Sequence, residues 1–163
     1  MTELSVRFRL ARIEGIHLGR LVDEFEELIG STHDSTDPAI LRLTPSPYPD
    51  DEQASAAFAE STRNDLLDRR STDAAVVRSA LARFDADPES LTEAEAMRSS
   101  EVVIDADDID SWLRTLTALR LVLASRLGIA EEDRHDTDDP RFAMYDWLGY
   151  RLEVLVQAAE GQD

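Results

Sequence analysis

The chain has 163 residues, of which 42% are apolar and 32% are charged. This length suits one folded domain with an ordinary core, and the apolar fraction argues against a disordered chain. Its 35 acidic residues outnumber 17 basic residues, all of them arginine, and the formal net charge is −18. A role in binding DNA or RNA would have to overcome this charge, because phosphate backbones are bound by clusters of cations.

Cysteine is absent from the sequence, which excludes disulfides, zinc–thiolate sites and thiol nucleophiles. No apolar run reaches the roughly 18 residues that a membrane span needs. The first residues, MTELS, lack the basic start and the apolar stretch of a secretory signal. We therefore expect a cytoplasmic protein that makes no contact with membranes.

The N-terminal segment alternates apolar and polar residues over 6–10, which is typical of a half-buried strand. Residues 13–17, interrupted by Gly15, could return as a second strand and complete a short hairpin. A lone hairpin is marginally stable in water, so we expect this one to pack on helices. The spacing of apolar residues then predicts a helix over 18–29.

The middle of the chain begins with a proline-rich loop over 31–49, which Ile40, Leu41 and Leu43 are expected to anchor onto the core. Residues 85–101 are polar, and a short helix can begin at Thr92 within them. The remaining predicted helices cover residues 50–70, 72–84, 109–127 (ended by Gly128) and 141–159.

Two of these helices are apolar on more than one side. The last helix places Tyr145 and Leu148 on its main apolar face, whereas Trp147, Tyr150 and Val154 lie nearly opposite. A helix that is apolar all round is buried centrally or covered by a partner. We expect the helices over 109–127 and 141–159 to be the inner pair of the fold, and we treat Trp147, Tyr150 and Val154 as a candidate interaction face.

Together these elements predict a mainly α fold. We expect a single helical domain over 1–163, formed by a bundle of about five helices with a short N-terminal β-hairpin packed on it.

Common catalytic and nucleotide-binding motifs are missing from the sequence: GxGxxG, GxxxxGK[ST], GxSxG and HExxH. Two E-x-x-H patterns occur, Glu14 with His17 and Glu132 with His135, and in di-iron bundles this pattern places two ligands on one helical face. Neither lies inside a predicted helix here, and the acidic segments depart from the calcium-loop pattern. We expect no metal and no cofactor, assign no catalytic residue, and favour a non-enzymatic protein.

Arg120 falls on the apolar face of the predicted 109–127 helix. A guanidinium stays charged, so it must reach the surface or pair with a carboxylate. Asp65, on the inner line of the 50–70 helix, is the nominated partner in a buried ion pair. The alternative is a ligand site in an interhelical pocket that contains Arg120, Asp65 and Arg126.

Several segments, taken in order, carry a family resemblance. They are R-L-T-P at 42–45, Y-P-D-D at 48–51, W-L at 112–113, L-R-L-V-L at 119–123, R-L at 126–127 and Y-D-W-L at 145–148. Their order and spacing resemble the actinobacterial family of domains of unknown function that carries the number two thousand and seventeen, over nearly the whole chain. Members of that family often have an Asn-Asp pair where this chain has Thr117 and Ala118.

The resemblance implies a small bacterial cytoplasmic protein without an assigned activity. Family genes often lie beside the gene for the adaptor that feeds substrates to the Clp protease, and some members have been labelled transcriptional regulators. Three hypotheses follow. The first is a non-enzymatic interaction or regulatory module, whose partner is an unknown protein (linked to proteolysis by gene position alone) or a second copy of the chain. The second is a small-ligand binder or enzyme that uses the pocket around Arg120. The third is a transcription-related regulator, although the sequence has no basic helix.

Overall fold

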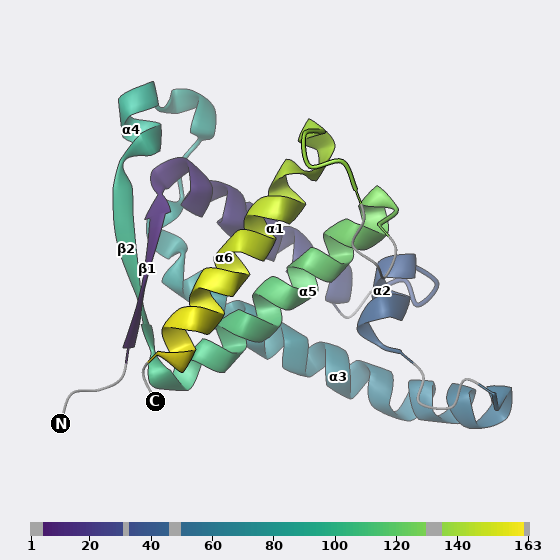
Figure 1. Cartoon of the computed structure of the whole chain (residues 1–163). Helices are drawn as coiled ribbons and strands as arrows, with labels where there is room; N and C mark the ends of the chain where they lie inside the picture. The colour runs from purple at the N-terminus through teal and green to yellow at the C-terminus, as the bar shows by residue number, and fades with distance from the viewer. Residues whose placement is uncertain (1–4, 31–32, 46–49, 130–134, 162–163) are drawn as a thin grey trace.

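The computed structural model describes residues 5–30, 33–45, 50–129 and 135–161, and these ranges contain six α-helices and two β-strands (Figure 1). The elements are β1 (Ser5–Ala11), α1 (Arg12–Ile29), α2 (Pro38–Leu43), α3 (Glu52–Ala80), α4 (Glu93–Met97), β2 (Ser99–Asp105), α5 (Ile109–Leu127) and α6 (Ala143–Glu160). The predicted fold class is confirmed, because the chain is mainly helical and carries a short two-stranded antiparallel sheet on its helices.

The sheet is formed by β1 and β2, which run antiparallel with Ser5 opposite Asp105 and Ala11 opposite Ser99. The second strand was expected over 13–17, and this detail is wrong because those residues are the first turns of α1. The Glu14 carboxylate accepts a hydrogen bond from the Ala11 backbone N–H at 2.8 Å. This bond satisfies one of the free N–H groups at the start of α1, so the helix begins directly after β1.

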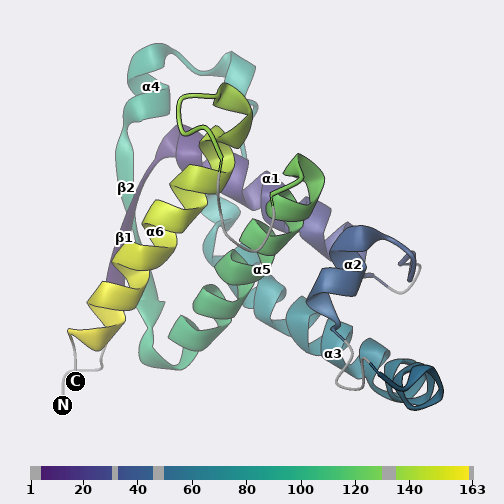
Figure 2. The same cartoon turned by 45° about the vertical axis from the view of Figure 1, so that its right-hand side comes forward.

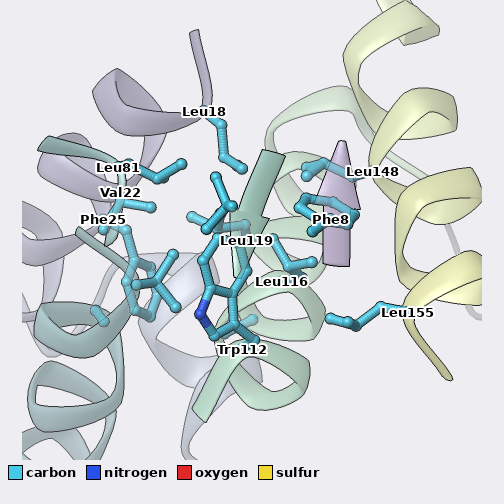
Figure 3. Close-up of a cluster of buried hydrophobic side chains, with 14 of the residues drawn as sticks. Phe8, Leu18, Val22, Phe25, Leu81, Trp112, Leu116, Leu119, Leu148 and Leu155 are labelled. Atoms are coloured by element: carbon cyan, nitrogen blue, oxygen red, sulfur yellow. The ribbon is translucent and has the colours of Figure 1, made fainter. Parts of the chain in front are cut away.

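The core lies between the inner face of the sheet and the long helices. Figure 3 shows apolar side chains from the strand, α1, α5 and α6 pointing toward one another, among them Phe8, Leu18, Leu116 and Leu148. Trp112 of α5 is only 1% exposed, and its ring packs edge-on against Phe8 at 5.6 Å between centroids. Burial of these side chains is the main stabilising contribution to the fold.

Two differences from the predicted helices affect the shape of the molecule. α3 is one continuous helix of 29 residues where two helices were expected, and its N-terminal half extends beyond the rest of the body (Figures 1 and 2). Part of the expected loop over 31–49 folds as α2, where Ile40 and Leu43 are fully buried and Leu41 is exposed. Residues 31–32 and 46–49 of that loop lie outside the described residues.

α5 occupies the centre of the helical layer, because it packs against α2, α3 and α6. α6 packs against α5 and β1, and it keeps an exposed side. The prediction of two inner helices is therefore correct for α5 and wrong for α6. α5 ends as predicted at Gly128, whose φ of 73° is the left-handed conformation that favours glycine. In the described ranges, no helix combines the length and apolar character needed to cross a bilayer.

Candidate functional site

A surface groove with a volume of about 690 Å³ lies between α3 and α5. It is lined by Leu66, Arg69, Arg70, Thr72 and Asp73 of α3 and by Leu113, Arg114, Thr117 and Leu121 of α5. The spacing of these residues explains why they meet, since positions three or four apart share one face of a helix. The groove is therefore made by two helix faces and contains no loop residue.

The groove is closed at one end by a polar contact between the two helices. Asp73 accepts hydrogen bonds from Arg114 Nε at 2.8 Å and Nη2 at 3.0 Å, and from Ser111 Oγ at 2.9 Å. The bonds from Arg114, followed by that from Ser111, outweigh the effect of burial and hold the pKa of Asp73 below its ordinary value. From this contact α3 and α5 diverge, as Figures 1 and 2 show, so the groove opens where the helices separate.

The chemistry of the lining is apolar below and positive at the rim. Leu66, Leu113 and Leu121 are half-buried and form the floor. Arg69 is exposed at the rim, and the Arg114 side chain is 59% exposed despite its pairing with Asp73.

Arg70 is the third arginine of the groove, and it is half-buried. Its Nη2 donates to the Leu43 carbonyl at 3.2 Å, and burial lowers the pKa of its guanidinium. The nine lining residues thus include three arginines and one aspartate. This ratio inverts that of the whole chain, in which acids outnumber bases by two to one. The lining is suited to binding a ligand in which an apolar part lies next to a negatively charged group.

Arg120 does not lie in this groove. Its guanidinium covers the ring of Tyr145 at 4.1 Å from the centroid, which is the distance of a cation–π contact. A Cβ added at Gly149 would lie 3.0 Å from Arg120 Nε, so the glycine of α6 leaves room for the guanidinium. Asp65, the predicted partner of Arg120, is exposed on α3, whereas the Arg120 guanidinium lies over Tyr145 of α6.

Arg126, the third residue of the predicted interhelical site, binds a different helix. Its two terminal nitrogens donate to the two carboxylate oxygens of Asp37, each at 2.8 Å. Asp37 also caps α2 by accepting the Ala39 backbone N–H at 2.9 Å. Arg120 and Arg126 therefore contact different parts of the chain, and Asp65 is exposed on α3.

The candidate interaction face on α6 is divided by the fold. Trp147 is half-buried, and its indole N–H donates to the Glu14 carboxylate of α1. The same carboxylate accepts Arg151 Nη2 at 3.0 and 3.1 Å, so this part of the face is used inside the chain. Tyr150 and Val154 remain 62% and 36% exposed, and their role as a contact surface stays a prediction.

The E-x-x-H pattern of Glu14 and His17 lies inside α1, contrary to the prediction that it falls outside a helix. His17 is exposed, while Glu14 is occupied by Ala11, Trp147 and Arg151. His135 binds Asp146, and Glu132 is outside the described residues. The part of the chain that the structure describes holds no group of three or more histidine, cysteine, aspartate or glutamate side chains placed to bind a metal ion.

A family model described as Domain of unknown function (DUF2017) matches residues 2–159. The chain belongs to this family. The comparisons with curated proteins and with solved structures found no match to this chain. The DUF2017 match contains both walls of the groove. It also contains all six helices of the described ranges, except for the last residue of α6.

The groove was missed by reasoning from the sequence, although two signals point toward it. One is the adjacent pair Arg69 and Arg70 in a strongly acidic chain. The other is Leu121, which lies outside the main apolar stripe of α5. Neither signal reveals a site by itself, because the groove also requires that α3 and α5 face each other.

Proposed function

We propose that this DUF2017 protein is a non-enzymatic protein-interaction module of the bacterial cytoplasm, and that its partner docks in the groove between α3 and α5. The observation that supports the proposal most directly is the composition of the groove. Half-buried leucines form an accessible apolar floor, and arginines stand at its rim. Protein interfaces combine an apolar core with a polar rim, and arginine is more frequent in them than on the rest of the surface.

A small-ligand or enzymatic role has less support from the same groove. Sites for small molecules enclose most of the ligand surface, whereas this groove is open along one side. Its single carboxylate, that of Asp73, is engaged by Arg114 and Ser111. A groove of this kind holds a segment of another chain better than it holds an isolated molecule.

Photo-crosslinking inside cells of the source organism tests the proposal. A photoreactive residue would replace Thr117 in the groove, and the matched control would carry it at Tyr150 on α6. We expect a specific crosslinked protein from position 117 that disappears when Leu121→Glu places a charge in the floor. Crosslinks from position 150 alone, or from neither position, would contradict docking in the groove.

A further inference from the structure

The chemistry of the groove also indicates what kind of segment it takes, and this step rests on the proposed function. We infer that the groove binds an acidic amphipathic helix of the partner. The apolar side of that helix lies on the leucine floor (Leu66, Leu113 and Leu121), and its carboxylates face the exposed arginines of the rim (Arg69 and Arg114).

The length of the groove matches two turns of a helix. On α3 the lining runs from Leu66 to Asp73, and on α5 it runs from Leu113 to Leu121. At a rise of about 1.5 Å per residue these stretches are about 10.5 Å and about 12 Å long. A helix that docks through apolar residues at i, i+3 or i+4, and i+7 has anchors over about 10.5 Å. The floor therefore offers contacts over the same length as such a helix presents.

The charge of the groove decides which helix is preferred. The one carboxylate of the lining, on Asp73, is already neutralised by Arg114 and bonded to Ser111. The exposed side chain of Arg69 carries a positive charge that makes no ion pair among the described residues. Carboxylates of a partner would pair with Arg69 and with the exposed part of Arg114. A basic helix would instead meet like charges at the rim and would be attracted to the rest of the acidic surface.

The net charge of −18 gives this interaction a distinctive dependence on salt. At long range the whole protein repels an acidic segment, and only at contact do the arginines attract it. Salt screens charges separated by more than about 10 Å at 0.1 M, and short-range pairs are screened less. The association rate of an acidic helix should therefore rise as NaCl increases from about 0.01 M to about 0.1 M. The association rate of a basic helix, which the acidic surface attracts, should instead fall as NaCl increases over the same range.

The test uses the full chain and a fluorescent helical peptide of about four turns, with leucine at i, i+3 and i+7 and glutamate elsewhere on its surface. A second peptide replaces each glutamate with lysine. Binding is followed by fluorescence anisotropy. We expect the acidic peptide to bind and Arg69→Glu to weaken it by at least about tenfold. The control Arg7→Glu changes the net charge by the same amount on the far strand β1, where the side chain is 75% exposed, and should weaken binding by less than about twofold.

Each outcome bears on one proposal or on the other. Stronger binding of the lysine peptide, or equal effects of Arg69→Glu and Arg7→Glu, would overturn the acidic helix. So would displacement of the peptide by inorganic phosphate alone, which would indicate a simple anion site. If crosslinking at Thr117 finds a partner while the acidic peptide does not bind, the groove is a docking site for a different segment. Loss of the crosslink at Thr117 would instead remove the proposed function itself. Far-UV circular dichroism of each variant confirms that it is folded.

Discussion

Gly15 marks the place where α1 comes closest to the segment that follows α3. A Cβ built at Gly15 would lie 2.4 Å from Phe84 Cγ, and Phe84 itself is only 4% exposed. At Gly19, one turn later, the nearest atom would be Arg78 Nη1 at 3.6 Å, which is ordinary contact. The two glycines of α1 therefore have different roles, since only Gly15 is required by packing.

Replacing each glycine with alanine separates packing from helix propensity. Gly19→Ala should stabilise the protein by up to about 1 kcal/mol, because alanine is the better helix former. Gly15→Ala should destabilise it by about 1–3 kcal/mol, because overpacking against a buried ring exceeds that gain. Urea unfolding of the two variants measures both changes in the free energy of unfolding. If both substitutions changed the free energy of unfolding in the same direction, the packing of α1 on Phe84 would be contradicted.

Glu14 joins three parts of the chain through one carboxylate, which binds Ala11 before α1 and both Trp147 and Arg151 on α6. Burial raises the pKa of this carboxyl. The hydrogen bonds from Ala11, Arg151 and Trp147 together outweigh burial, so the pKa lies below its ordinary value of 4.5. When folding lowers the pKa of a carboxyl, its contribution to stability is fully present at pH values above the pKa of the unfolded chain. That contribution is lost as the pH falls through the pKa of the folded protein.

Glu14→Gln should therefore destabilise the protein by about 1.5–3 kcal/mol at neutral pH, because charge-assisted hydrogen bonds are lost. The difference from the wild type should narrow as the pH falls below the ordinary value of 4.5 and through the lower pKa of the folded protein, because the wild-type carboxylate is then itself protonated. Unfolding by urea at a series of pH values measures this difference. A difference that stays constant over this range would rule out the proposed linkage.

Arg120 shows what a helical pattern can predict about one residue. Its angle on α5 correctly placed it away from solvent, and the structure finds it half-buried. The pattern predicts which way the side chain points but not its neighbour, so it could not indicate that Arg120 lies over Tyr145. The space beside Gly149 and the ring of Tyr145 became visible only when α5 and α6 were packed together.

At the scale of elements, local signals predicted the helices well and the sheet only in part. α5 was predicted with its ends, because its apolar spacing is long and Gly128 terminates it. The alternating residues of β1 were also correct. Its partner β2 begins within the segment interpreted as polar (85–101) and continues past it, and the burial of Val102 and Ile104 reveals its inner face. Pairing between distant segments depends on the whole fold, so local sequence favours the nearby segment 13–17 over β2.

The contact between α2 and α5 is held by the paired hydrogen bonds of Arg126 and Asp37. The Arg126 guanidinium, which donates to Asp37, holds the pKa of that carboxyl below its ordinary value. The Arg126 side chain is 47% exposed, so solvent weakens the pair.

A double-mutant cycle with Asp37→Asn and Arg126→Met should give a coupling energy of about 0.5–1.5 kcal/mol. Asparagine keeps the cap of α2, so the cycle isolates the ion pair from the loss of the cap. Thermal or urea unfolding supplies the four free energies. Additive effects of the two substitutions would mean that the pair does not hold α2 on α5.

For the whole molecule, the distribution of charge separates the groove from the rest of the surface. The chain has 35 acidic and 17 basic residues, and three of the arginines line one groove. We expect no retardation of duplex DNA at physiological salt, because three arginines on so acidic a molecule cannot neutralise a run of phosphates. A salt-sensitive shift of DNA mobility at micromolar protein would contradict this expectation and would support a transcription-related role.

The groove itself could not be predicted from the sequence. Each of its walls is an ordinary helix face, and Leu66 and Leu113 look like core residues in either helix taken alone. What makes them a site is the divergence of α3 from α5 on the N-terminal side of Asp73 (Figure 2). Both leucines are only half-buried in the groove that results. That divergence is a property of the packed molecule, so composition and periodicity contain no trace of it.

Methyl NMR of the full chain during titration with the acidic helical peptide tests docking in the groove most directly. The methyl signals of Leu66, Leu113 and Leu121 report the groove, and that of Val154 reports the exposed side of α6. We expect saturable shifts of the three leucine signals, while the Val154 signal stays in place. Shifts confined to Val154, or shifts spread evenly over the molecule, would contradict a binding site between α3 and α5.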